Sequence, residues 1–120
     1  MKKYRAPAEF MKNWINGLKS GDYNQNTETA EFYRIDYDSN DYDKSYCALG
    51  VALKANDIPI KDSDTNFNKL TELLVPLSNE KTVSKFFSEV YRRNDTEKLK
   101  FSEIAEWLEQ NVELVDELVA

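Results

Sequence analysis

Apolar residues recur every three or four positions through much of this chain, which is the period of an amphipathic helix. Pro7 suits the first turn of the first such segment, Trp14 lies on its apolar face as a core residue, and Gly21 suits a left-handed stop. Asn66 or Asn68 suits the start of the third segment. The period predicts helices in five segments, which are 6–21, 45–57, 66–77, 78–95 and 100–120.

The second segment holds an unbroken run of apolar and small residues from Cys47 to Leu53. Ser45 is a plausible N-cap, and Asn56 suits the end of this helix. Gly50 lies in the helix interior, where glycine costs about 1 kcal/mol relative to alanine. We therefore predict that the run is a packing hub and that Gly50 allows another helix or an aromatic ring to approach closely.

Between the first two helical segments the helical period is lost. From Phe32 to Tyr37 the pattern alternates, with Tyr33, Ile35 and Tyr37 on one side, which predicts a short strand or one arm of a hairpin. The flanking Asn, Asp and Ser residues favour turns. The sequence thus predicts a mainly α, single small domain over residues 1–120, with about five helices and one short β-strand or hairpin element.

The charge of the chain is unevenly distributed. Residues 1–100 hold sixteen acidic and sixteen basic residues, so the whole net charge of −6 comes from residues 101–120. Such an end is unsuited to direct contact with nucleic acid or an anionic membrane. Lys2, Lys3 and Arg5 are followed by no apolar segment, so we expect no signal peptide. With one cysteine and no apolar run of about 20 residues, the chain is expected to be cytoplasmic.

Few residues of this chain suit catalysis. It has no histidine, which excludes histidine-based triads and histidine metal ligands. Cys47 is the only thiol, and its apolar neighbours favour a buried structural cysteine. No glycine-rich phosphate-binding loop is present. We therefore expect no enzymatic activity and no cofactor.

Two segments resemble the beginning of a calcium-binding loop. Asp36, Asp38 and Asn40 match the first three ligand positions, and the segment from Asp62 to Asn66 repeats the match. In both segments the sixth position is not glycine and the twelfth is not glutamate. We expect turns stabilised by Asp and Asn side chains and no bound metal.

The last predicted helix carries an acidic stripe as well as an apolar one. Its carboxylates recur at a spacing of three or four residues and extend over about 21 Å of helix. One DNA strand carries about six charges over that length, so the stripe matches a single strand. It is either a solvated surface or a docking surface for a basic partner. The residues of the stripe are Glu103, Glu106, Glu109, Glu113, Asp116 and Glu117.

Three motifs together resemble a known family. They are Trp14 to Gln25 in a W-x3-L-x-S-G-x-Y-x-Q pattern, a Cys-Ala-Leu-Gly-Val segment from Cys47, and Asn94-Asp95 followed by a Phe-x-x-Ile-Ala-x-x-Leu-Glu ending. The chain resembles a family of small proteins encoded by tailed bacteriophages and prophages, for which no activity is assigned. The second cysteine of the family motif is Ala48 here. The resemblance implies a phage accessory protein that acts in the host bacterial cytoplasm.

The leading hypothesis is a non-enzymatic interaction protein that binds and inhibits a host bacterial protein with a basic surface, in anti-phage defence or nucleic-acid metabolism. One alternative is a protein that binds and sequesters a nucleotide signal, and another is a structural phage accessory protein. An enzyme that uses Cys47 is the least favoured. A small-molecule pocket would need basic and aromatic groups that converge, and the candidates are Tyr23, Gln25, Arg34, Tyr46, Arg92 and Arg93.

Overall fold

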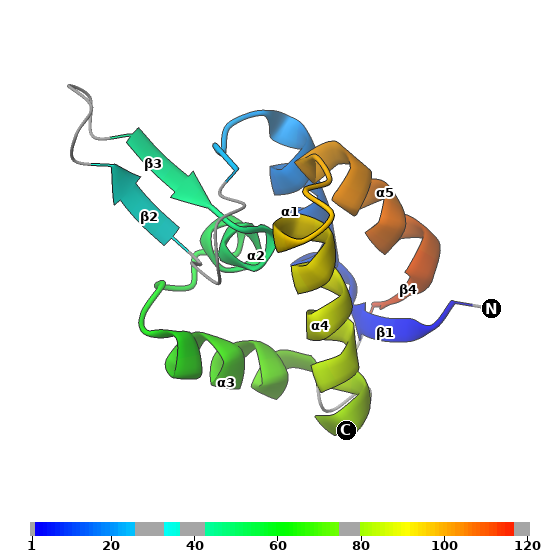
Figure 1. Ribbon diagram of the computed structural model, residues 1–120. Helices are drawn as coiled ribbons and strands as arrows, with labels where there is room; N and C mark the ends of the chain where they lie inside the picture. Colours follow the sequence, from blue (N-terminus) through cyan, green and yellow to red (C-terminus); the bar gives the residue numbers. More distant parts are fainter. Residues whose placement is uncertain (1, 26–32, 37–42, 75–79, 117–120) are drawn as a thin grey trace.

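Helices form most of the computed structural model, which describes residues 2–25, 33–36, 43–74 and 80–116 (Figure 1). The described residues contain five helices and four short strands packed into one mainly α unit. The mainly α fold class predicted from the sequence is thereby confirmed. In chain order the elements are β1 (Tyr4–Pro7), α1 (Ala8–Ser20), β2 (Tyr33–Asp36), β3 (Asp43–Tyr46), α2 (Ala48–Ala55), α3 (Ser63–Leu74), α4 (Glu80–Asp95), α5 (Phe101–Asn111) and β4 (Val112–Val115).

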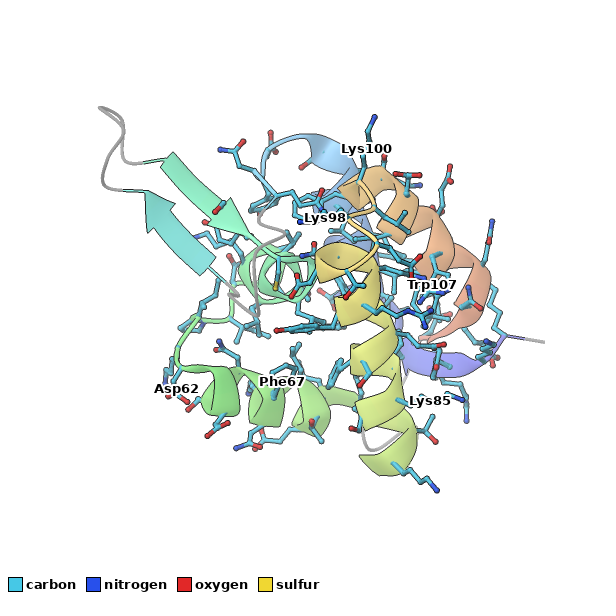
Figure 2. The ribbon with its side chains drawn as sticks, viewed as in Figure 1. Asp62, Phe67, Lys85, Lys98, Lys100 and Trp107 are labelled. Atoms are coloured by element: carbon cyan, nitrogen blue, oxygen red, sulfur yellow. The ribbon has the colours of Figure 1, made fainter. Side chains whose placement is uncertain are left out.

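Helix α3 begins three residues earlier than the sequence predicts, because Asp62 supplies its first hydrogen bonds (Figure 2). The Asp62 carboxylate accepts from the backbone N of Thr65 at 2.9 Å and from its hydroxyl at 2.8 Å. Asn66, a predicted cap, lies inside the helix, where its buried side chain bonds to the backbone of Lys61. The calcium-like segment at Asp62 is therefore helix-capping chemistry, as expected.

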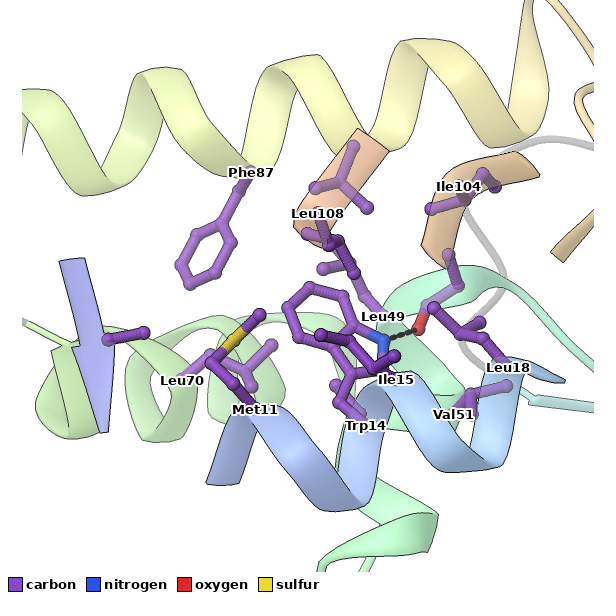
Figure 3. Close-up of a cluster of buried hydrophobic side chains, with 14 of the residues drawn as sticks. Met11, Trp14, Ile15, Leu18, Leu49, Val51, Leu70, Phe87, Ile104 and Leu108 are labelled. Carbon is purple, nitrogen blue, oxygen red and sulfur yellow. Dashed lines mark hydrogen bonds between the residues drawn. The ribbon is translucent and has the colours of Figure 1, made fainter. Parts of the chain in front are cut away.

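The core forms where α1 packs against α2 and α5, and side chains of α3 and α4 complete it (Figure 3). Trp14 is fully buried in this core, and its indole N–H donates to the carbonyl of Ala48 at 2.9 Å, which satisfies its one polar group. The ring also meets Phe86 of α4 edge-on, at 6.1 Å between centroids. These contacts confirm the prediction that Trp14 is a core residue.

Helix α2 begins at Ala48 because β3 extends through Tyr46. Ser45 therefore lies in a strand, and the sequence prediction that it caps the helix is wrong. The N-cap is Cys47, whose sulfur accepts from the Gly50 backbone N at 3.4 Å. The predicted end at Asn56 is confirmed.

At Gly17 of α1 the chain lies close against α2. A Cβ atom at this position would lie 3.0 Å from Val51 Cγ1 and 3.1 Å from Ala55 Cβ. Glycine therefore lets the two helix backbones approach here without overlap. Gly50 is buried as predicted, and its need for a close neighbour stays a prediction.

The alternating pattern before α2 does form a hairpin. Strands β2 and β3 pair antiparallel, with Tyr33 opposite Tyr46 and Asp36 opposite Asp43. Tyr37, which the alternation also placed in a strand, lies outside the described residues, as do Asp38 and Asn40 of the first calcium-like segment.

The second sheet joins the two ends of the described chain. Strand β1 pairs parallel with β4, with Tyr4 opposite Val112 and Pro7 opposite Val115. The prediction of one helix over 100–120 is therefore wrong after Asn111. Val112 is buried, as its place in the apolar stripe predicted, but it is buried as part of strand β4 and not of a helix.

Candidate ligand-binding groove

The predicted acidic stripe does not lie along one helix. Glu103, Glu106 and Glu109 lie on α5 and are exposed, whereas Glu113 lies in β4 and Asp116 follows that strand. Glu117 lies outside the described residues. Because the helix ends at Asn111, the match of six carboxylates to one DNA strand is wrong.

Other elements also neutralise part of this charge. Glu109 pairs with Lys19 of α1 at 2.6 Å, and Glu113 lies 3.8 Å from Arg5 of β1. Glu103 accepts from the Lys100 backbone N at 3.0 Å and so belongs to the cap of α5. The stripe has no basic residue in its own segment, but the fold places two beside it.

Several candidate residues of the small-molecule alternative are engaged in contacts within the fold, and Tyr23, Gln25 and Tyr46 lie close together. Gln25 donates through Nε2 to Asn94 Oδ1 at 3.0 Å and to the Leu99 carbonyl at 2.7 Å. Its amide group therefore has a structural role. The rings of Tyr23 and Tyr46 meet edge-on at 5.3 Å. Arg34 lies in β2, with its backbone in register with Ser45.

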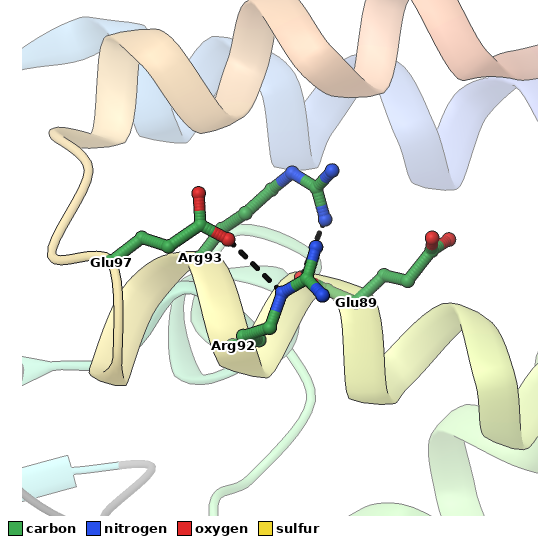
Figure 4. A network of polar contacts seen from close by, with 4 residues as sticks. All are labelled: Glu89, Arg92, Arg93 and Glu97. Carbon is green, nitrogen blue, oxygen red and sulfur yellow. Dashed lines mark hydrogen bonds and ion pairs between the residues drawn. The ribbon is translucent and has the colours of Figure 1, made fainter.

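Arg92 and Arg93 of α4 contact different partners, Glu97 and Glu89 (Figure 4). Arg92 Nε lies 3.0 Å from Glu97 Oε2. Arg93 stacks its guanidinium 4.1 Å from the Trp107 ring centroid and donates to the Glu89 carbonyl at 3.0 Å. Neighbouring residues on a helix point about 100° apart, so the two arginines serve different surfaces. The structure thus gives Arg92 and Arg93 different neighbours, and a pocket shared by the six predicted residues stays a prediction.

A different set of side chains lines a groove between α3 and α4. Its volume is about 470 Å³. The residues from α4 are spaced by three or four positions and so lie on one face, opposite two residues of α3 one turn apart. The lining residues are Phe67, Thr71, Ser84, Phe87, Ser88, Tyr91, Arg92 and Thr96.

The groove has an apolar floor and a polar rim. Phe67 projects from α3 toward α4 (Figure 2), and its ring centroid lies 6.1 Å from that of Phe87. Phe87 is buried and Phe67 half-buried. Ser84, Ser88 and other lining residues supply hydroxyl groups. Such a site can hold a flat apolar group and hydrogen-bond its edges.

The hydroxyl of Tyr91 in this groove stays protonated at neutral pH. Burial raises its pKa to about 12, and the negative charge of Asp95 and a hydrogen bond to it act in the same direction. Tyr91 is therefore suited to hydrogen bonding and not to proton abstraction.

Behind the groove, the end of α4 is tied to the start of α2 by Asn94. Its buried Oδ1 accepts from the Ala48 backbone N at 3.1 Å as well as from Gln25. Its Nδ2 donates to Asp95 Oδ1 at 2.6 Å. Residues from all three sequence motifs, Gln25, Ala48 and Asn94, thus meet at one point, and the contacts there are structural.

Cys47 lies beside this junction and is only 3% exposed. Burial raises its pKa from 9.0 to about 11, so the sulfur is a thiol at neutral pH. The prediction that Cys47 is buried is confirmed. Within the described residues, no three side chains of metal-binding type gather into a cluster.

Sequence reasoning missed the groove because it needs the packing of α3 against α4. A signal was nevertheless present, since Ser84, Ser88 and Tyr91 repeat at helical spacing beside the core stripe that contains Phe87. The serines give that side of α4 small side chains, which leave space against a neighbouring helix.

No protein-family model, curated protein or solved structure matches the chain. The resemblance to phage and prophage proteins stays a prediction. Among the helices of the described segments, none combines the length and the apolar character that crossing a membrane requires.

Proposed function

We propose that this protein is a non-enzymatic binding protein and that the groove between α3 and α4 holds a small molecule. The observation that supports this most is the lining, which combines two phenylalanine rings, hydroxyl groups and one guanidinium around about 470 Å³. Pockets for small molecules are typically about 300–1,000 Å³, mostly apolar and equipped with a few polar groups. The proposal replaces the predicted ligand residues except Arg92.

The non-catalytic part of the proposal is supported by the state of two side chains. Tyr91 carries a hydroxyl whose pKa is raised to about 12, and Cys47 is a buried thiol with a pKa raised to about 11. Neither group is a nucleophile or base at neutral pH. The remaining lining side chains suit binding.

Filling the groove tests this function. Ser88 lines the groove and is exposed, so Ser88→Phe should occupy the space without disturbing the core. Ser102→Phe adds the same ring at an exposed position of α5 and serves as the control. Wild-type and variant proteins are screened by thermal shift against a library of bacterial metabolites. A ligand that stabilises wild type and the control but not Ser88→Phe supports the proposal. It fails if no compound stabilises wild type, or if Ser88→Phe responds equally.

A second candidate function is the phage-encoded inhibitor that docks on a basic host protein. It is supported by Glu103, Glu106 and Glu109, which are exposed on α5 on the side opposite the buried Ile104 and Leu108. Association through exposed carboxylates weakens with salt. The test is capture from a bacterial lysate with wild type and with a Glu103→Gln/Glu106→Gln variant at two salt concentrations. Equal capture of the same protein by both would reject the docking role.

A further inference from the structure

We infer that the ligand of the α3–α4 groove is a planar aromatic anion, whose acidic group is held by Arg92 in place of Glu97. The inference rests on the proposed function of the groove. Two observations support it. The guanidinium of Arg92 lies at the rim of the groove, beside the aromatic rings that line it, and the carboxylate of Glu97 contacts that guanidinium.

The aromatic part of the ligand follows from the floor of the groove. Phe67 and Phe87 come from different helices, their rings tilt by 53° relative to each other, and both line the groove as an apolar surface. Tyr91 extends the surface along α4 by one turn from Phe87. Aromatic groups bind such surfaces by offset or edge-to-face contact.

The anionic part follows from Arg92, the only charged side chain among the eight that line the groove. A guanidinium has five N–H donors in a planar fork that matches carboxylate, sulfonate or phosphate oxygens. The contact with Glu97 is made through Nε at 3.0 Å. A ligand oxyanion of the same chemistry can take the place of that carboxylate.

Glu97 is held on Arg92 by the backbone. The N–H groups of Thr96 and Glu97 both donate to the Arg92 carbonyl at 2.9 Å, and Lys98 then adopts a positive φ of 54°. The turn after α4 therefore returns the Glu97 carboxylate to the guanidinium. Both side chains of the pair are about half exposed, at 58% and 42%, so the pair is a weak one and can be displaced.

This arrangement makes opposite predictions for the two partners. Removing the positive charge of Arg92 should weaken the binding of an aromatic anion, because the anion loses its counter-charge. Removing the negative charge of Glu97 should strengthen the binding of the same anion, because Glu97 no longer competes with it for Arg92. A neutral aromatic molecule of the same shape should respond to neither change.

Two fluorescent probes with a common ring system test these predictions. One is 8-anilinonaphthalene-1-sulfonate, and the other is N-phenyl-1-naphthylamine, which lacks the sulfonate. Both are titrated against wild type, Arg92→Gln and Glu97→Gln, with Lys85→Gln and Glu106→Gln as charge-matched controls at exposed positions outside the groove. Backbone amide NMR shifts locate the bound probe, and circular dichroism verifies the fold of each variant.

We expect the sulfonate probe to bind about tenfold more weakly to Arg92→Gln, which is the loss of one charge-assisted hydrogen-bonded contact. It should bind about two- to threefold more tightly to Glu97→Gln, since an exposed pair is weak. The affinity of the neutral probe for every variant should change by less than about twofold. The same limit holds for the affinity of the sulfonate probe for the two control variants, because an exposed charge outside the groove contributes little.

The outcomes separate this inference from the proposed function. If both probes shift α3 and α4 amides and Ser88→Phe blocks them, but Arg92→Gln weakens neither, the groove binds small molecules and the anionic ligand class is wrong. If neither probe shifts these amides, the inference fails and the groove has no support as a ligand site. The inference is also overturned if Glu97→Gln increases the affinity for the neutral probe as much as it increases the affinity for the sulfonate probe.

Discussion

At the scale of single residues, Asn94 has the most connections of any polar side chain described above. Its carboxamide oxygen serves as the acceptor for the first N–H of α2 and for Gln25, in a setting where only 1% of the residue is exposed. The sequence placed Asn94 only near the end of the predicted helix over 78–95 and in one of the three motifs. The role was not predictable, because Ala48 and Gln25 become its neighbours only through tertiary packing.

Replacing Asn94 should therefore destabilise the protein. In Asn94→Leu the buried N–H of Ala48 loses its acceptor, which costs about 1–3 kcal/mol. Gln25→Leu should cost less, because Ala48 keeps its bond to Asn94 in that variant. Urea unfolding of both variants measures the difference, and equal losses of unfolding free energy would contradict the assignment.

Cys47 gives a second prediction at this scale. Its raised pKa of about 11, against 9.0 ordinarily, leaves about a hundredfold less thiolate in the native state at pH 8. Labelling by an aromatic disulfide reagent should be slower by at least that factor than in urea. Because the native pKa is the higher one, the stability associated with Cys47 is complete below pH 9 and is lost as the pH rises toward 11. Equal labelling rates with and without urea would refute the buried thiol.

At the scale of elements, hydrophobic period predicted which segments form helices, but it did not predict where they end. Val112 fits both a helix stripe and a strand, and the strand forms because Tyr4 and its neighbours supply a partner far away in sequence. The C-terminal caps Gly21 and Asn56 could be predicted, whereas the predicted N-caps Ser45 and Asn66 were wrong. The groove required the relative placement of α3 and α4, which no local pattern contains.

Proline at two successive positions of β4 distinguishes a strand from a helix. Neighbouring N–H groups of a paired strand point in opposite directions, so only one of Glu113→Pro and Leu114→Pro should remove a bond to β1. That variant should lose about 1 kcal/mol and the other little. In a continuous helix both would lose about 3 kcal/mol. Chemical unfolding of the two variants measures the losses, and two large, equal losses would show that the segment is helical.

At the scale of the whole molecule, the pairing of β1 with β4 closes the described chain into a loop. Arg5 and Glu113 face each other in register and both are exposed. A disulfide between Arg5→Cys and Glu113→Cys would constrain roughly a hundred residues in the unfolded state, and chain entropy predicts up to about 5 kcal/mol of stabilisation. The thermal midpoints of the oxidised and reduced forms measure the gain, with the two single variants as controls. Failure of the two cysteines to form a disulfide would contradict the parallel register.

The same pairing has a consequence for how the protein is made. On the ribosome β1 is synthesised more than a hundred residues before its partner strand. At about 5–20 residues per second, β1 waits several seconds without its partner. A nascent chain that stops before Val112 leaves Ala6 and Tyr4 without the strand that pairs with them. The fold therefore cannot be complete before Val112–Val115 are synthesised, and chains that terminate earlier present an unpaired strand edge to cellular proteases and chaperones.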